Sequence, residues 1–287
     1  SFGMAVPLLL IFGATMGCID VVVNIQAVIV EKAAGRRLMS GMHALWSVGG
    51  FAGAGLFGIW VGTFALTPLL STIIAAAIMV LVTLAASRHL LPYGGDAGGK
   101  LLALPKGIVT FVGIIACIAF LVEGAIMDWG GVFLTTVRHF DMSLAGTAFT
   151  VFSAAMLTMR LFGDWTVQKL GQERVVIGGS LLAVAGFLLV ICAAEPALLY
   201  LGFFAIGIGC ANVVPVFFSL LGKQRVMPVS LAVPAVSTLG YLGILMGPAV
   251  IGFIAHQTSL YTAFGLLAFL VLLQSIIAAY VYRHILD

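Results

Sequence analysis

The chain alternates long apolar runs with short polar breaks. Nine such runs occur, at residues 4–30, 41–64, 67–87, 107–136, 143–165, 174–193, 197–221, 228–255 and 259–283. About 20 residues of α-helix cross the roughly 30 Å hydrocarbon core of a bilayer. Because backbone polar groups in lipid must be satisfied within the segment, runs of this length predict helices rather than strands. The pattern therefore predicts an all-α, multi-pass membrane protein with nine transmembrane helices.

The longest polar break, residues 88–106, divides the predicted helices into two groups. It contains Pro92, a Gly94-Gly95-Asp96 turn and the pair Gly98-Gly99, a composition typical of flexible linkers. We expect a partial N-terminal bundle of three helices at residues 1–87, a linker at 88–106, and a C-terminal bundle of six helices at 107–287.

Basic residues gather at every second break. They are Lys32, Arg36, Arg37, Arg88, Lys100, Lys106, Lys169, Arg174, Lys223, Arg225 and Arg283. The opposite breaks hold one basic residue, Arg138. Since basic loops stay on the cytoplasmic side, the linker and the C-terminus are predicted to be cytoplasmic, and residue 1 to lie at the outer face.

Composition supports lipid as the main solvent of this protein. Apolar residues make up 62% of the chain and charged residues 8%, with a mean hydropathy of +1.23. Soluble domains carry about 25% charged residues, so a soluble enzyme and a nucleic-acid-binding protein are both excluded. The four cysteines lie inside apolar runs without metal-site spacing. With no nucleophile–base pair or metal cluster at helical spacing, we expect neither an enzyme nor a cofactor.

Two adjacent segments recur later in the chain in the same order. Gly17-Cys18-Ile19-Asp20-Val21-Val22 matches Gly209-Cys210-Ala211-Asn212-Val213-Val214, and three glycines of the next run, Gly49, Gly53 and Gly58, match Gly243, Gly247 and Gly252. A parallel duplication of this kind is typical of transporters with two halves related along the membrane normal. Doubling the unit predicts twelve helices, of which the first three precede this chain. We interpret the glycines as positions of close packing and hinging.

Acidic residues near the centre of a span are costly in lipid and are candidates for function. Asp20 lies just past the middle of the first span, with Asn24 one turn further along the same face. Glu123 lies near the middle of the fourth span. We predict that Asp20 and Glu123 couple transport to protons and that Asn24 binds substrate; the alternative for Asp20 is a neutral acid that packs between helices.

Other polar residues in the spans are candidate substrate contacts. They are His43, Trp46, Asp128, Trp129, Asn212, Ser237 and Tyr241. His43 lies near a predicted cytoplasmic end, where solvation is the alternative, and Asp128 with Trp129 is equally typical of an interfacial anchor. Ordinary hydrogen bonding between helices is the alternative for Ser237 and Tyr241. Pro215 interrupts the helix just after Asn212 and frees a backbone carbonyl.

These features together resemble the major facilitator superfamily, with the chain corresponding to helices four to twelve of that fold. The Asp20-x-x-x-Asn24 pattern is similar to the fucose–proton symporter branch, and the stretch from Glu123 to Trp129 is similar to bacterial inner-membrane relatives of unassigned substrate. The resemblance implies a cytoplasmic gating loop with the residues Arg160, Gly163, Asp164, Lys169 and Arg174. Gln168 replaces the acid of the family's loop pattern, and we expect Asp164 to take over its contact.

The favoured function is therefore proton-coupled secondary transport of a small polar solute, with a sugar as one candidate, by alternating access. The expected partners are that solute, protons and membrane lipid, without nucleic acid. Two alternatives stay open: a proton-driven exporter of amphipathic compounds, which the aromatic and methionine content would suit, and a membrane sensor that binds a ligand without moving it.

Overall fold

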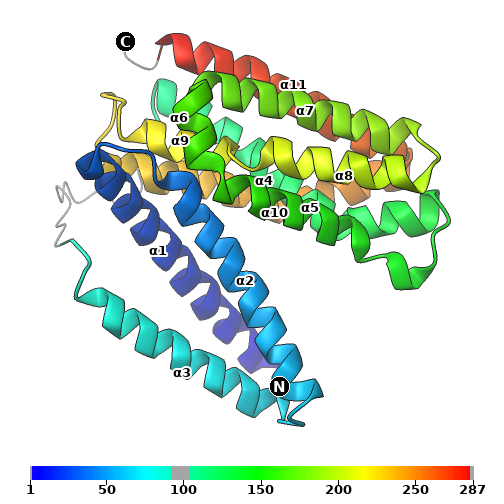
Figure 1. The fold of residues 1–287 in the computed structure, drawn as a ribbon, viewed down its shortest axis with the longest axis horizontal. Coiled ribbons are helices and arrows are strands. Elements are labelled where there is room, and N and C mark those ends of the chain that lie inside the picture. Colours follow the sequence, from blue (N-terminus) through cyan, green and yellow to red (C-terminus); the bar gives the residue numbers. More distant parts are fainter. Residues whose placement is uncertain (1, 92–103, 285–287) are drawn as a thin grey trace.

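The computed structural model describes residues 2–91 and 104–284, and these are helical almost throughout (Figure 1). The long helices are α1 (Phe2–Ala34), α2 (Met39–Gly62), α3 (Pro68–Ser87), α4 (Ile108–Val132), α5 (Thr147–Leu161), α7 (Gln172–Cys192), α8 (Pro196–Cys210), α10 (Val229–Gln257) and α11 (Leu260–His284). The short ones are α6 (Gly163–Leu170), α9 (Val213–Leu221), a π-helical turn η1 (Phe133–Val137) and a 3₁₀ turn η2 (Met142–Leu144). No strand occurs in the described residues.

The predicted spans and fold class are confirmed. Over the described ranges, nine helical segments are long and apolar enough to cross a membrane, and each overlaps one predicted run. Three segments combine a long helix with a shorter one: η1 continues α4, η2 precedes α5, and α9 continues α8. The fifth predicted run extended to residue 165, but its helix ends at Leu161. A separate helix, α6, then begins at Gly163 and carries both Asp164 and Lys169.

The C-terminal helices α4–α11 form one packed body, and glycines set its closest crossings. A Cβ atom on Gly186 would lie 2.7 Å from the carbonyl oxygen of Gly202, so α7 and α8 touch backbone to backbone. Gly243 of α10 lies even closer to the backbone of Cys117 in α4. Small residues allow this close approach. In lipid, where no hydrophobic driving force brings helices together, such close packing stabilises their association. The predicted packing role of Gly243 is therefore met in the structure.

The N-terminal helices α1–α3 are far more exposed, and α3 lies at the outside of the molecule (Figure 1). Leu69 and Leu81 in α3 are 71% and 66% exposed. The expected packing at Gly49 and Gly53 is not met within this chain, because no other described segment lies within 4 Å of a Cβ atom built there. The repeat is also locally unequal: Gly17–Val22 lies within continuous α1, whereas its match at 209–214 contains the break between α8 and α9.

The two groups of helices meet mainly at one end. Helix α1 contacts α9 and α10, and α2 contacts α5, α6 and α9. In Figure 1 the start of α2 lies beside α6 and α9, while its far end diverges from the C-terminal helices. Val28 and Met39 join a buried apolar cluster with Val213 and Phe217 at this end. The centre of the proposed linker, 92–103, lies outside the described residues, so the division into two bundles stays a prediction.

Candidate functional site

Glu123 and Arg160 form an ion pair inside the membrane-spanning part of the molecule. Arg160 Nη2 lies 3.7 Å from Glu123 Oε2, and the Arg160 side chain is 6% exposed against 33% for Glu123. The sequence analysis placed Arg160 in the gating loop; the structure places it in α5, one turn before α6, with its guanidinium directed at α4. A buried guanidinium is stable only when it is paired and hydrogen-bonded. Glu123 supplies the charge, and it keeps access to the space between the helix groups.

The remaining contacts of Arg160 follow from a proline. Pro215 has no N–H to donate to the carbonyl four residues earlier, which belongs to Ala211. Arg160 Nε donates to that carbonyl at 3.1 Å. The helix is broken at Ala211–Asn212, between α8 and α9, as the position of Pro215 predicted. Arg160 Nη1 donates to Ser47 Oγ of α2 at 3.1 Å, so the same guanidinium also joins the two helix groups.

Asp20 forms a second acidic centre, on α1. Asn24 Nδ2 donates to the Asp20 carbonyl at 2.9 Å and to Asp20 Oδ1 at 3.2 Å, which confirms the predicted side-by-side placement. The Asp20 carboxyl also lies beside the Tyr241 hydroxyl of α10. The Tyr241 ring packs 6.2 Å from that of Phe120, one helical turn before Glu123. Asp20 is thus adjacent to α10, and Tyr241 connects it to the helix, α4, that carries Glu123.

Several predicted contact residues carry buried polar atoms without a partner in the described structure. These atoms are His43 Nε2, Asn212 Nδ2 and Oδ1, and Ser237 Oγ. The His43 ring packs 5.9 Å from that of Phe218, and its Nε2 is buried although the residue as a whole is partly exposed. Asn212 lies at the α8–α9 break, where its Oδ1 touches Gly163 of α6. Buried polar atoms of this kind are costly unless another group satisfies them.

The other candidates are less central. Trp46 is 56% exposed, and Asp128 is exposed as well. Trp129 Nε1 donates to the Pro248 carbonyl at 3.1 Å, and its ring lies against Gly252. This contact attaches α4 to the proline-containing part of α10, and it occupies the only polar hydrogen of the indole. Over the described ranges, no group of three or more metal-ligating side chains occurs.

The first turn of α2 is capped by two carboxylates, one from each group of helices. Helix α2 has no capping side chain of its own, although its first amides lack partners within the helix. Glu31 Oε2 accepts from the amides of Leu38 at 2.9 Å and Met39 at 2.8 Å. Asp164 of α6 accepts from Ser40 at 3.0 Å (Oδ1) and Gly41 at 2.8 Å (Oδ2). The positive end of the α2 dipole further favours the two negative charges.

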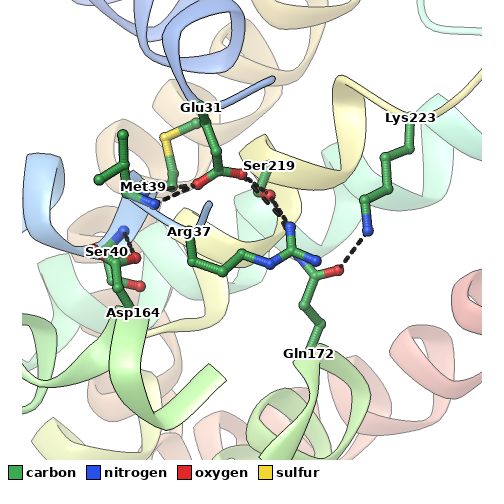
Figure 2. Close-up of polar contacts among 9 residues, drawn as sticks. Glu31, Arg37, Met39, Ser40, Asp164, Gln172, Ser219 and Lys223 are labelled. Carbon is green, nitrogen blue, oxygen red and sulfur yellow. Dashed lines mark hydrogen bonds and ion pairs between the residues drawn. The ribbon is translucent and has the colours of Figure 1, made fainter. Parts of the chain in front are cut away.

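Glu31 also connects α1 to α9 (Figure 2). Its Oε1 accepts a hydrogen bond from Ser219, and it lies 3.6 Å from Arg37 Nη1, which donates to Ser219 Oγ at 3.0 Å. Gln172 extends the chain of bonds: its Nε2 donates to Ser219 at 3.3 Å, and its Oε1 accepts from Lys223 at 3.1 Å. We call the contacts of Glu31, Arg37, Ser40, Gly41, Asp164 and Ser219 the α2-terminus contact.

Burial shifts the pKa of the charged groups at this contact. Removal from water raises the pKa of Asp164 above its ordinary value, and the nearby Glu31 charge adds to the rise. The amides of Gly41 and Ser40 act in the opposite direction, because they stabilise the ionised carboxylate. Desolvation and the neighbouring Arg37 charge lower the pKa of Lys223.

The predicted gating residues therefore separate into three environments. Arg160 belongs to the central ion pair. Gly163 and Asp164 lie at the α2-terminus contact, where Gly163 leaves room for Ser40. Lys169 lies 4.5 Å over the Trp165 ring, and Arg174 is exposed. Sequence reasoning missed Glu31, Arg37, Ser219 and Ser47, because it used the basic residues of the first loop for orientation alone. The burial of Glu31 is a property of the fold, and no local sequence signal distinguishes it from a solvated acid.

Known proteins resemble this chain in sequence. A family model described as Major Facilitator Superfamily matches residues 112–285. An uncharacterised MFS-type transporter of Yersinia pestis is 47% identical over 267 residues, which cover 92% of this chain and 69% of the relative. An uncharacterised transporter of Sinorhizobium fredii is 33% identical over 97% of this chain and 76% of its own length.

Solved structures are similar in fold. The human organic anion transporter MFSD10 superposes with a TM-score of 0.56 at 17% identity, over 93% of this chain and 83% of that protein. A bacterial homologue of the iron transporter ferroportin, in its outward-facing state, gives a TM-score of 0.58 at 13% identity, over 90% and 68%. At these identities the likeness concerns the fold alone.

Proposed function

Since this chain belongs to the Major Facilitator Superfamily, whose members are membrane transporters and not enzymes, we propose that it moves a small polar solute together with protons. The observation that carries the proposal is the Glu123–Arg160 ion pair. A carboxyl group in mid-membrane is stable in either of two conditions, which are its two protonation states. It is ionised beside a cation, or protonated when that cation pairs with another group. Exchange between these conditions is what proton coupling requires.

The geometry suggests how solute and proton binding are linked. Arg160 is held by Ala211 and Ser47 and keeps its place when Glu123 changes charge. A solute that accepts hydrogen bonds from Arg160 competes with Glu123, and the released carboxylate then takes up a proton. Asp20, bonded to Asn24 and facing Tyr241, offers a second protonation site on the other helix group.

We propose that the α2-terminus contact is the cytoplasmic gate in its closed state. The contact lies at the end that carries Lys32 and Arg36, which the distribution of basic residues predicts to be cytoplasmic. The helix groups diverge toward the other end, so the conformation corresponds to an outward-facing state (Figure 1). Asp164 takes the gating role that the family's loop pattern gives to the position of Gln168. We place the protein in a bacterial inner membrane, in line with its bacterial relatives.

The central polar groups favour a polar solute over an amphipathic export substrate. An ion pair, a carboxyl–amide pair and the unpartnered atoms of Asn212 and His43 would all lose hydration beside a greasy ligand. They are suited to a ligand with several hydroxyl or carboxylate groups. Sugars and small organic acids have this chemistry.

The test is proton movement in proteoliposomes that hold the full-length protein. Vesicles with an internal pH dye are challenged with a panel of sugars, polyols and small organic acids, without any imposed gradient. Solute-dependent proton movement that is lost in Glu123→Gln but kept in the exposed-carboxylate control Glu195→Gln supports the proposal. Equal proton movement in the wild type and Glu123→Gln, with any solute of the panel, would exclude Glu123 as the coupling acid.

A further inference from the structure

A basic pocket lies beside the α2-terminus contact. Its volume is about 540 Å³, and its walls come from the end of α1, the α6–α7 connection and the end of α9. Four basic side chains line it, with one acid: Lys32, Arg36, Arg37, Lys223 and Glu31. Pockets of a few hundred Å³ hold small ligands in other proteins. The size and the excess of positive charge together indicate an anion.

The single acid does not neutralise the pocket. Glu31 already accepts two α2 amides and the Ser219 hydroxyl, and it pairs with Arg37. Lys32 and Arg36 are exposed, and over the described ranges their side chains make no hydrogen bond or ion pair. Two cations of the N-terminal helices are therefore available to a ligand.

The pocket also brings like charges together across the two helix groups. Arg37 belongs to the α1–α2 connection, whereas Lys223 follows α9. Both side chains line the one pocket, where like charges repel each other. An anion placed between them would replace repulsion by two attractive interactions.

Backbone geometry keeps the walls of the pocket open. Gly35, with a φ of +63°, turns the chain between Lys32 and Arg36, and Gly171, with a φ of +88°, makes the turn from α6 into α7. Both conformations favour glycine, and neither residue places a side chain in the pocket. A guanidinium and ammonium groups around an open space suit a phosphate group, which accepts several charge-assisted hydrogen bonds at once.

We propose that this pocket binds a phosphate group, held by Lys32 and Arg36 of one helix group and Lys223 of the other, and that the bound phosphate stabilises the closed α2-terminus contact. The phosphate comes either from a soluble cytoplasmic anion or from the headgroup of an anionic lipid. Because the site is separate from the Glu123–Arg160 centre, phosphate binding there does not depend on the proposed coupling.

Two arms of one experiment distinguish the sources of the phosphate. The full-length protein is placed in nanodiscs of phosphatidylcholine and titrated with pyrophosphate at constant ionic strength, and separately in nanodiscs containing phosphatidic acid without added phosphate. The readout in both arms is the distance between spin labels at Ala33 and Arg174, with calorimetry for pyrophosphate and native mass spectrometry for the lipid. Binding in the first arm identifies a soluble anion, and binding in the second alone identifies a lipid.

The pocket variant is Lys32→Gln/Arg36→Gln, and the matched control Arg88→Gln/Arg283→Gln removes two exposed basic residues that do not line the pocket. We expect the pocket variant to weaken binding by at least about tenfold and to reduce the closed fraction, and the control to change affinity less than twofold. Equal weakening in both variants, or no binding in either arm, would overturn the proposal. Elution of both variants as monodisperse protein excludes misfolding as the cause.

Discussion

The carboxylate of Asp164, in the second group of helices, receives the amide hydrogen of Ser40, in the first, at 3.0 Å. This bond lies at the first turn of a membrane helix, where four amides need partners and the helix itself offers none. Glu31 satisfies two of the amides from within the first group, and Asp164 satisfies the other two from outside it. The helix terminus is therefore complete only while the two groups touch, which gives a chemical basis for a gate.

Removing the Asp164 carboxylate should open this contact. In Asp164→Ala the amides of Ser40 and Gly41 each lose their acceptor. Loss of a helix cap of this kind destabilises the capped state by about 0.5–2 kcal/mol. The open fraction should rise about 2- to 30-fold, which distance measurements between spin labels at Ala33 and Arg174 would detect. Gln168→Ala, at an exposed position on the same helix, serves as the control. An unchanged distance distribution in Asp164→Ala would show that the contact does not hold the gate.

The gate should respond to pH through Asp164. In the closed state burial raises the pKa of this carboxyl, whereas in an open state it would be solvated, with an ordinary pKa of about 3.9. The closed state then binds the proton more tightly, so closure becomes more favourable as pH falls toward the raised pKa. The closed fraction should increase as pH falls through the raised pKa of Asp164 toward its ordinary pKa, and Asp164→Asn should flatten that profile. A profile of the same slope in Asp164→Asn would assign the response to another group.

Pro215 should matter through the carbonyl that it frees. Pro215→Ala restores an N–H that can donate to Ala211 and compete with Arg160 Nε. We expect slower transport in a protein that still folds, since Pro215 lies in the first turn of α9, where a proline is tolerated. Pro196→Ala is the matched control, because Pro196 also lies in the first turn of its helix, α8, but away from the Ala211 carbonyl. Full transport in Pro215→Ala would show that the Ala211 contact is not required.

Asp20 should be required for uphill transport and not for binding. Asp20→Asn keeps a hydrogen-bonding side chain beside Asn24 and Tyr241 but cannot change its charge. Accumulation against a gradient should fall to background, while exchange of labelled for unlabelled solute continues. The comparison of uphill uptake with exchange in the same vesicles measures this. Uphill accumulation at the wild-type rate would exclude Asp20 as a coupling acid.

Much of the fold could be predicted, because an apolar run of sufficient length indicates a helix that crosses the bilayer. The nine spans, the Asp20–Asn24 pair and the break near Pro215 depend on local spacing within one helix, which a sequence displays. The location of Arg160 could not be predicted in the same way. Its partners Glu123, Ala211 and Ser47 lie on three other helices, so the contact depends on how those helices cross.

The roles of Glu31 and Ser219 could not be predicted from the sequence for a similar reason. Glu31 lies beside three basic residues, where a solvated surface acid is the ordinary expectation, and only the approach of α9 and the start of α2 buries it. The repeat also predicted close packing at both Gly49 and Gly243, which was more than this chain shows. Both fit one repeat pattern, but only Gly243 has a described neighbour, because packing depends on the facing helix as well as on the motif.

Proton movement in Glu123→Gln tests the central claim most directly. The full-length protein and the variant are reconstituted with an internal pH dye, and proton flux is recorded together with labelled solute flux for each solute that the wild type transports. The account predicts that Glu123→Gln still exchanges solute but moves no protons with it, while Glu195→Gln matches the wild type. A wild-type ratio of protons to solute in Glu123→Gln would contradict it.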